Sequence, residues 1–298
     1  MRRTFVLGAI LVVGVVSYTA FAQGQPPSAA ARDAARIQKV KDNLYVIAGS
    51  GADNMDVFSG GNTAVFVTET GVTLVDTKLP GFGPTLLERV KSVTDKPVTR
   101  IINTHAHGDH TGGNDFFPQP VEIVVHEGAR ANMTKERQTR TYKDRLTIGS
   151  GKDQVDLYYF GRGHTDGDTF VVFPAVRTMH VGDMFAWKAL PYVDPAAGGS
   201  VIEQPQSLAR AVATVKNVDT IINGHIPTST WNDFRDFADF TRDFVTFAEG
   251  ARKAGKPVEQ AAKEYRVPER FKGFVASLMP MASPATNLQL AYDELSRR

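Results

Sequence analysis

The residues best suited to chemistry lie in one short segment, residues 103–113. It places four potential metal ligands within six residues: His105, His107, Asp109 and His110. A regular strand or helix could not turn all four towards one point, whereas a loop with small spacers such as Ala106 and Gly108 can. Imidazole and carboxylate ligands without thiolate suit Zn²⁺, and they also allow Fe or Mn.

Three more candidate ligands follow downstream, each after an apolar run and beside glycine: His164, Asp183 and His225. Glycine lets the backbone approach an ion closely. A catalytic zinc site takes three protein ligands and keeps one position for water, so the four ligands of the first segment cannot all serve one such ion. The seven side chains are enough for two metal ions.

The composition excludes several other kinds of site. The 298 residues contain no cysteine, which rules out disulfides, thiolate metal sites, iron–sulfur clusters and a cysteine nucleophile. The net charge is +2, with 34 basic and 32 acidic residues. Because Arg2 and Arg3 account for the excess, the rest of the chain is neutral and offers no electrostatic reason to bind nucleic acid.

The first 22 residues have the pattern of a secretory signal peptide. Arg2 and Arg3 precede the apolar run 5–16, and Ala20-Phe21-Ala22 is a small-residue cleavage site. Twelve apolar residues are fewer than the roughly 20 of a membrane-spanning helix. We therefore predict cleavage after Ala22, export to the periplasm or medium, and no stable membrane anchor after cleavage. Residues 23–36 are predicted to be a flexible leader.

Residues 37–298 are predicted to form one domain. Strand-like runs lie at 44–48, 63–68, 72–76, 98–103, 121–126, 156–160, 169–173, 179–181 and 220–223. Helical periodicity is found at 85–94, 207–215 and 231–254, and the last of these carries a phenylalanine stripe that predicts a face buried against a sheet. Short helices are expected to close the domain after residue 258. This interleaving indicates an α+β fold with two sheets covered outside by helices.

A short internal similarity supports two comparable halves. Residues 100–105 (RIINTH) and 220–225 (TIINGH) agree at four of six positions, and in both an apolar strand ends at a histidine. Each half would then deliver a histidine from a strand end to a shared cleft.

The H-x-H-x-D-H segment, followed in order by His164, Asp183 and His225, resembles the metallo-β-lactamase superfamily of binuclear zinc hydrolases, over roughly residues 40–250. The resemblance implies an αββα sandwich of two mixed sheets with the metals at one edge. It also implies that His105, His107 and His164 hold the first zinc. Asp109, His110 and His225 would hold the second, and Asp183 would bridge the two.

The same resemblance implies hydrolysis of a small-molecule carbonyl compound. Two Zn²⁺ ions would lower the pKa of bound water to near 7, and the hydroxide would attack the carbonyl. Asp109 would orient the nucleophile and carry its proton, which makes it the candidate catalytic residue. We expect a cyclic amide such as a β-lactam as substrate. However, an aspartate at position 183 is usual in lactonases and glyoxalase II-like thioesterases of the superfamily.

Other interpretations also stay open at this point. An iron dioxygenase of the same fold would use one metal, and a non-catalytic binding protein would use none. Candidate substrate contacts are Phe58 in the 53–61 loop, Trp187 and Lys188, although each could equally serve packing or solvation. His126 and His180 are expected to be hydrogen-bonded structural residues. Asp166 and Asp168 could support His164 or close a turn.

Overall fold

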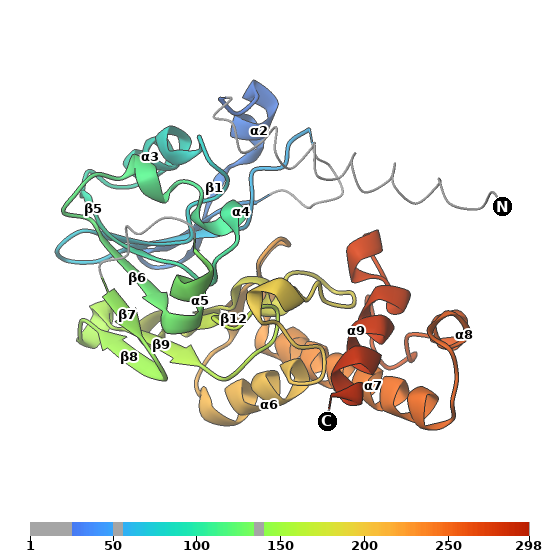
Figure 1. Cartoon of the computed structure of the whole chain (residues 1–298). Coiled ribbons are helices and arrows are strands. Elements are labelled where there is room, and N and C mark those ends of the chain that lie inside the picture. The colour runs from blue at the N-terminus through green and yellow to red at the C-terminus, as the bar shows by residue number, and fades with distance from the viewer. Residues whose placement is uncertain (1–25, 50–55, 134–139, 298) are drawn as a thin grey trace.

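Two β-sheets packed face to face form the centre of the computed structural model, which describes residues 26–49, 56–133 and 140–297 (Figure 1). The first sheet has the strand order β1-β2-β3-β4-β5-β6-β7, and the second has the order β13-β12-β11-β10-β9-β8. The first contains β1 (Ile37–Lys41), β2 (Leu44–Ile47), β3 (Thr63–Val67), β4 (Val72–Val75), β5 (Val98–Ile102), β6 (Glu122–His126) and β7 (Arg140–Tyr142). The second contains β8 (Arg145–Ile148), β9 (Val155–Tyr159), β10 (Thr169–Phe173), β11 (Thr178–His180), β12 (Thr220–Ile222) and β13 (Ser229–Thr230).

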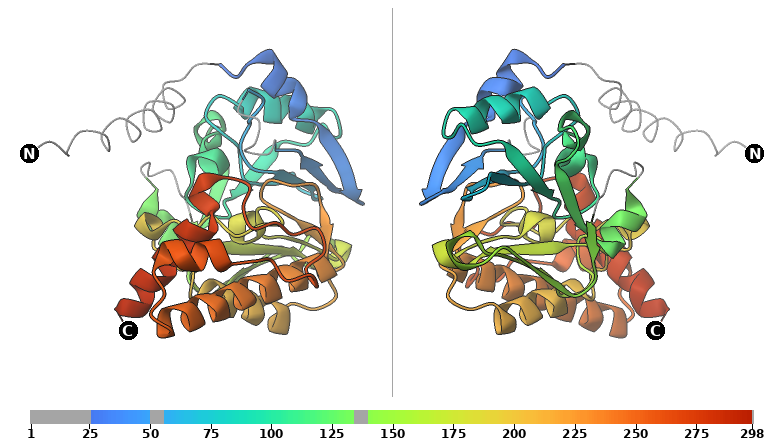
Figure 2. Two further views of the ribbon diagram at one scale, coloured as in Figure 1. Left: turned by 90° about the vertical axis from the view of Figure 1, so that its right-hand side faces the viewer. Right: turned by 90° about the vertical axis from the view of Figure 1, so that its left-hand side faces the viewer.

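Helices cover the outer face of each sheet (Figure 2). On the first sheet lie α2 (Ala29–Ala34), α3 (Gly83–Lys91) and α5 (Glu127–Asn132), while α4 (Gly108–Thr111) is a single turn after β5. On the second lie α6 (Gln204–Thr214), α7 (Trp231–Lys253), α8 (Val258–Glu264) and α9 (Pro284–Ser296). Short 3₁₀ turns occur at Asn114–Phe116, Gly151–Asp153, Pro174–Val176, Gly182–Phe185, Pro195–Ala197 and Pro280–Ala282.

Three apolar layers hold this arrangement together. Phe66, Phe173 and Leu157 lie in the layer between the two sheets, and none is more than 1% exposed. The outer layer of the second sheet receives the phenylalanine stripe of α7, including Phe234 and Phe244. Burying alternate faces of each strand and one face of each helix stabilises this order of layers. The predicted α+β fold, an αββα sandwich of two mixed sheets flanked by helices, is confirmed.

The longest helix, α7, begins at a hydrogen-bonded cap. Thr230 Oγ1 accepts a bond of 3.1 Å from the Asp233 N–H, and the Asp233 carboxylate accepts one of 2.9 Å from the Thr230 N–H. This reciprocal capping box satisfies N–H groups that the first turn of a helix leaves unpaired. The cap fixes where α7 starts and therefore where its phenylalanine stripe meets the sheet.

Part of the predicted leader, Ala29–Ala34, forms the helix α2. Ser28 Oγ accepts a bond of 3.0 Å from the Ala31 N–H and so caps α2. Ala31 and Ala35 are buried, and Arg89 of α3 donates to the Ala35 carbonyl at 3.1 Å. An alanine-rich segment becomes helical here because one of its faces packs on α3.

The predicted signal peptide, residues 1–22, lies outside the described residues. Cleavage after Ala22 and export therefore stay predictions, and an N-terminus other than Gln23 on exported protein would contradict them. Among residues 26–49, 56–133 and 140–297, none of the helices is both long enough and apolar enough to cross a bilayer.

Parallel strand pairs bring two sets of loops to one edge of the sandwich. In the first sheet β4 and β5 are parallel, with Val75 opposite Ile102. In the second sheet β11 and β12 are parallel, with His180 opposite Ile222. Because parallel neighbours end on the same side, the loops that follow these four strands lie together. The similar RIINTH and TIINGH segments begin within β5 and at the start of β12, respectively, and run into the loops that follow these strands.

Candidate metal centre

The first four candidate ligands follow β5 in a loop that becomes one helical turn. His107 caps α4 with an extended backbone (ψ 145°), and its carbonyl accepts a bond of 3.0 Å from the Thr111 N–H. His105 and His107 therefore lie on the loop, whereas Asp109 and His110 lie on the turn. This change of backbone conformation turns four near neighbours in sequence towards one place, as predicted from the spacing.

The other three candidate ligands come from the second sheet. His164 follows β9, Asp183 lies in the turn Gly182–Phe185 after β11, and His225 follows β12. Gly182 has φ +50°, and a Cβ at this position would lie 2.7 Å from the Thr104 side chain. A glycine is required there because the turn that carries Asp183 presses against the loop of the first sheet.

The structure brings all seven side chains together: two groups of three share no residue, and a third group, His105, His110 and Asp183, links them. Ligand atoms of His105, His107 and His164 lie within 4.8 Å of one another, and so do those of Asp109, His110 and His225. In the first group His164 Nε2 lies 2.9 Å from His107 Nδ1. In the second, His110 Nε2 lies 3.3 Å from His225 Nε2.

Asp183 lies between the two groups. Its Oδ1 is 3.3 Å from His110 Nε2, and its Oδ2 is 3.3 Å from His225 Nε2. The same Oδ2 is 3.8 Å from His164 Nε2 in the other group. A carboxylate within reach of both groups has the position that a bridging ligand needs.

The histidines are oriented as metal ligands usually are. His164 Nδ1 bonds to the Tyr192 carbonyl at 2.8 Å, His107 Nε2 to Asp194 at 2.9 Å, and His105 Nδ1 to Thr104 Oγ1 at 3.0 Å. One nitrogen of each ring is thus held by the protein while the other is turned into the cluster. His105 Nε2 is buried and has no hydrogen-bond partner, which fits a position reserved for a metal ion.

The charges of the cluster also fit cations. Burial alone would raise the pKa of Asp109 and of Asp183, but the imidazoles of His110 and His225 hold both carboxyl pKa values well below their ordinary range. In return, despite its burial, the pKa of His225 is raised to about 9, mainly by Asp183, and that of His110 is raised well above its usual value by Asp109 and Asp183. Without metal, protons on two imidazoles balance two carboxylates. Divalent ions would replace those protons.

Two histidines of the other group, His105 and His164, stay neutral. Burial, followed by the neighbouring imidazoles, holds the pKa of His105 well below 6.5, and burial lowers that of His164 to about 4. Neutral imidazole is the form that binds a metal ion. Only His107 of this group has a raised pKa, because its bond to Asp194 outweighs the effect of burial.

Metal affinity is expected to fall as the pH falls from 8 to 6. His110 and His225 bind protons in the metal-free protein and must release them when metal binds. Below the pKa of its group, each displaced proton therefore weakens the apparent metal affinity about tenfold for every pH unit. Competition with a chromophoric chelator at pH 6, 7 and 8 measures this slope. A zinc affinity that is independent of pH would contradict the proton balance described above.

Asp76, which was not among the residues predicted from the sequence, forms hydrogen bonds that orient part of the metal centre. It is buried directly after β4 with φ +64°, and its Oδ1 accepts the Thr104 N–H at 2.8 Å. Its Oδ2 accepts the Thr104 hydroxyl and faces His110 Nδ1, both at 2.7 Å. One carboxylate thus orients two parts of the ligand loop. Its position after a strand parallel to β5 was the signal that could have revealed it.

A second missed residue is the fully buried Lys78, which has φ +63°. Its Nζ donates to the Ala48 and Gly61 carbonyls, each at 2.8 Å. Desolvation lowers the pKa of Lys78 to about 7, although Asp76 and Asp109 oppose this shift. The side chain ties together the two ends of the segment that carries Phe58.

The three candidate substrate contacts have different surroundings. Phe58 stacks on His225 with ring centroids 5.8 Å apart, and the Trp187 ring lies 6.1 Å from the same histidine. Lys188 instead forms an ion pair of 2.5 Å with Asp233. Its ammonium group is therefore already bound at the start of α7. The part of the predicted 53–61 loop before residue 56 lies outside the described residues.

His126 and His180 are hydrogen-bonded, as expected. His126 accepts the Gly128 N–H at 3.0 Å and stacks on Tyr159, while His180 accepts the Gly182 N–H at 3.1 Å. Asp168 accepts two bonds from Thr165 and so closes the turn after His164, and burial raises its pKa to about 7.

Asp166 has a different neighbour, since it accepts a short hydrogen bond from the Tyr159 hydroxyl. Asp168 therefore bonds to the neighbour of His164 and Asp166 bonds to Tyr159, whereas the His164 ring bonds to the Tyr192 carbonyl and to His107.

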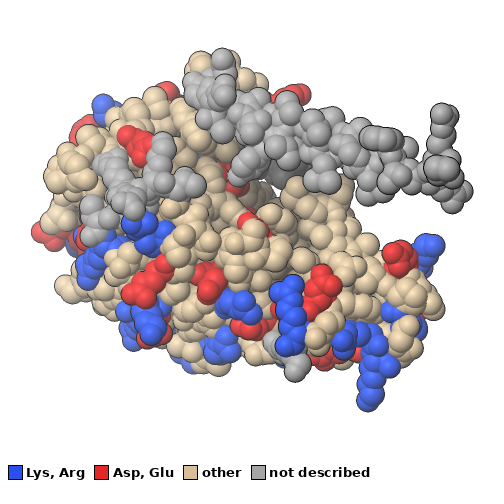
Figure 3. Space-filling model, viewed as in Figure 1, with Lys and Arg blue, Asp and Glu red and all other residues tan. Residues whose placement is uncertain are grey.

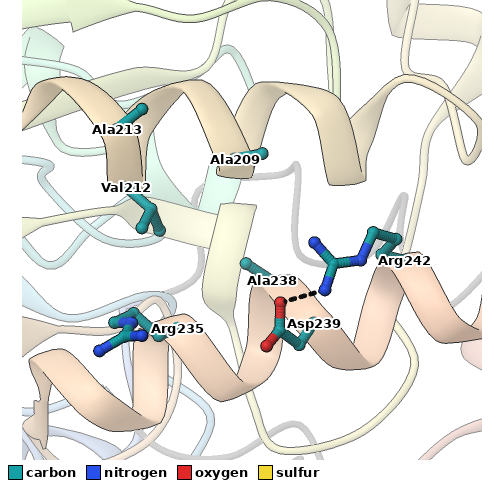
Figure 4. A pocket seen from close by; sticks show the side chains of 7 residues that line it. All are labelled: Ala209, Val212, Ala213, Arg235, Ala238, Asp239 and Arg242. Carbon is teal, nitrogen blue, oxygen red and sulfur yellow. Dashed lines mark hydrogen bonds and ion pairs between the residues drawn. The ribbon is translucent and has the colours of Figure 1, made fainter.

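A separate shallow groove of about 200 Å³ lies between α6 and α7 (Figure 4). It is lined by alanines, Val212 and the ion pair of Arg242 with Asp239 at 2.7 Å. None of the seven clustered side chains lines this groove, so the groove is separate from the candidate metal centre at the edge of the sheets.

Comparison with known proteins gives a consistent result. The sequence matches the family model described as "Metallo-beta-lactamase superfamily" over residues 57–225. Metallo-beta-lactamase type 2 of Elizabethkingia meningoseptica is 27% identical over 247 residues, which cover 78% of this chain and 91% of that protein. The 2,4-dinitroanisole O-demethylase subunit alpha of Nocardioides sp. (strain JS1661) is 35% identical over 125 residues, 39% of this chain and 38% of that protein.

Solved structures share the fold. A metallo-beta-lactamase from Pontibacter korlensis superposes with a TM-score of 0.61 at 20% identity, covering 70% of this chain and 98% of its own. The sec-alkylsulfatase Pisa1 from Pseudomonas sp. superposes with a TM-score of 0.71 at 14% identity, covering 94% of this chain and 54% of its own. The family match spans more than half of the chain and includes all seven clustered side chains. This chain belongs to the metallo-β-lactamase superfamily, whose members are metal-dependent hydrolases.

Proposed function

We propose that this hydrolase opens a cyclic amide such as a β-lactam, using two divalent metal ions, most simply Zn²⁺. The observation that carries the metal-dependent part is the convergence of seven side chains around the unpartnered His105 Nε2, with Asp183 between the two groups. The choice of a β-lactam is supported by the relative from Elizabethkingia meningoseptica, a metallo-beta-lactamase matched over 91% of its length.

The residues divide the work between holding metal and handling protons. When bound, divalent ions in such a site polarise a substrate carbonyl and lower the pKa of coordinated water towards 7. His105, His107 and His164 would hold one ion, Asp109, His110 and His225 the other, and Asp183 would contact both. The groups present are oxygen and nitrogen donors only, which suits zinc and also allows Fe or Mn.

Asp109 is the residue best placed to move a proton. Its Oδ2 lies 3.4 Å from His225 Nε2 and 3.5 Å from His110 Nε2, and its side chain is 22% exposed while that of His110 is fully buried. Because its pKa is held low, Asp109 stays ionised and can accept a hydrogen bond from an attacking water. It can then pass the proton towards the leaving group on the open side.

A lactone or thioester is the second candidate substrate, and two observations favour it. Position 183 is an aspartate, which is usual in the lactonases and thioesterases of the superfamily. In addition, Lys188 is bound by Asp233, and Lys78 is bound by two backbone carbonyls. Neither lysine has a free ammonium group with which to bind the carboxylate of a β-lactam.

A substrate panel separates these candidates. Zinc-loaded protein is assayed on a cephalosporin, an acyl-homoserine lactone, a glutathione thioester and a phosphodiester, and we expect the cephalosporin to be turned over fastest. A lactone or thioester turned over at least tenfold faster would replace the β-lactam proposal. Metal analysis runs beside it, because one iron per chain would indicate a dioxygenase and no bound metal a binding protein.

A further inference from the structure

A small apolar cluster links the metal ligands to residues 279–282. The Trp187 ring lies 6.1 Å from the His225 ring, and the Tyr192 ring lies 6.0 Å from the His107 ring. Trp187 belongs to a small buried cluster to which the C-terminal region contributes Ala282 and Met279. The other members of this cluster are Ala186, Ala189, Tyr192 and Ile226. The cluster therefore joins the metal centre to residues far along the chain.

The segment 274–282 shows large apolar side chains to solvent. Among the described residues four large apolar side chains are exposed, and three are here: Val275 (43%), Leu278 (54%) and Met281 (55%). The fourth, Phe116 (41%), lies against Gly83 at the start of α3. Exposed large apolar side chains that gather in one part of a protein mark a place where something binds, and these three lie within residues 275–281.

The backbone of this segment is held in place although its side chains are exposed. The Val275 N–H donates to the Lys188 carbonyl at 3.0 Å, and Val275 forms an isolated parallel bridge with Ala189. Asn287, at the start of α9, donates to the Pro191 carbonyl at 3.1 Å. The segment is therefore fixed along residues 188–191, which directly follow Trp187.

The cation beside Trp187 is already paired within the protein. Lys188 follows Trp187 directly, and its ammonium forms an ion pair with Asp233 at 2.5 Å, while Lys272, two residues before Phe274, is exposed. Figure 3 shows a hollow in this face of the molecule, with mostly uncharged residues and a few acidic ones visible beside it. A ligand group that lies here gains apolar contact and forms no ion pair with Lys188.

We propose that residues 274–282 are a binding wall for the apolar, non-reacting part of the substrate, an alkyl chain or aromatic ring, while its carbonyl lies at the metal centre. This inference rests on the proposed hydrolase function. Three exposed side chains form the wall (Val275, Leu278 and Met281), and Trp187 and Met279 connect it to the ligands. The wall lies beyond residues 57–225, the part matched by the family model.

The test measures binding separately from turnover. Butanoate and octanoate are titrated calorimetrically into the zinc-loaded full chain, because their carboxylate can bind zinc while only octanoate reaches far along the wall. Each fully buried CH₂ strengthens binding about fourfold, so for a partly open surface we expect octanoate to bind at least about tenfold more tightly. In the double variant Leu278→Ser, Met281→Ser that ratio is expected to fall below about threefold.

Matched controls make the outcome decisive. Phe116→Ser removes an equally exposed apolar side chain elsewhere and should leave the chain-length ratio unchanged. An unaltered ratio in the double variant overturns the wall. So does a dimer, seen by sedimentation in the parent protein, that the double variant dissociates, because the patch would then join two copies. Octanoate preference without hydrolysis of any panel substrate overturns the proposed function alone, whereas hydrolysis without chain-length preference overturns the wall alone.

Discussion

A His105→Ala variant is expected to lose hydrolytic activity by about a thousandfold or more while staying folded. His105 contributes the buried Nε2 that has no protein partner, so removing it takes away a metal ligand and breaks few protein contacts. A metal ion in a hydrolase supplies several kcal/mol of transition-state stabilisation, and about 1.4 kcal/mol corresponds to a factor of ten in rate. Activity on the best panel substrate and zinc content per chain are the two measurements.

The control for this prediction is another buried histidine. His126→Gln removes a hydrogen-bonded imidazole that stacks on Tyr159 and belongs to neither ligand group. It should lower thermal stability but keep the zinc content and activity. If His105→Ala retained full activity with its circular dichroism spectrum unchanged, the assignment of the first metal site would fail.

Asp76→Ala is expected to weaken both zinc binding and folding. The substitution leaves the Thr104 N–H, the Thr104 hydroxyl and His110 Nδ1 without their acceptor. Loss of a residue that orients a metal ligand typically costs 10- to 100-fold in metal affinity, about 1.4 to 2.7 kcal/mol. Each buried donor left unpaired costs about 1–3 kcal/mol, so about 3 kcal/mol or more of unfolding free energy is expected to be lost.

Competition titration with a chelator and urea unfolding separate the two effects. Asp76→Asn keeps one carbonyl oxygen and should lose less of both. Asp156→Asn is the matched control, because Asp156 is also a buried carboxylate with several hydrogen-bond partners, but its partners are Thr147, Gln154 and Arg145 of the other sheet. It should cost stability and leave zinc affinity unchanged. Unchanged zinc affinity in Asp76→Ala would mean that His110 does not need this carboxylate.

The candidate ligands were predictable because each follows an apolar strand and stands beside glycine or another small residue. This local pattern is present at His105, His164, Asp183 and His225, and it identifies them as candidate ligands without knowledge of the fold. Asp76 lacks such neighbours. It can be recognised only once β4 is known to run parallel to β5 and to end beside it, and strand pairing is a long-range property that local sequence does not encode.

The secondary structure was predicted best where burial is complete. β3, β4 and β10 are almost entirely buried and read as apolar runs, and α7 shows its phenylalanine stripe directly. The missed strands β1, β7, β8 and β13 lie at sheet edges and carry exposed residues, so their alternation is weak. The helix α2 was missed because its stability depends on contact with α3.

The apolar wall could not be predicted from local sequence either. Leu278 and Met281 resemble core residues in a sequence, and only the structure shows that they are exposed beside a cluster containing Trp187. Sequence reports which residues are apolar, whereas exposure depends on which distant segments cover them.

The seven ligands divide between the two layers of the sandwich: four follow β5 of the first sheet, and His164, Asp183 and His225 follow strands of the second. Each ion would therefore be bound by ligands from both sheets, so that bound metal would cross-link the two halves of the molecule. Native protein saturated at a hundred times its dissociation constant for one ion gains about 2.7 kcal/mol by mass action alone. Scarcity of metal would then lower the fraction of enzyme that is folded as well as its catalytic activity.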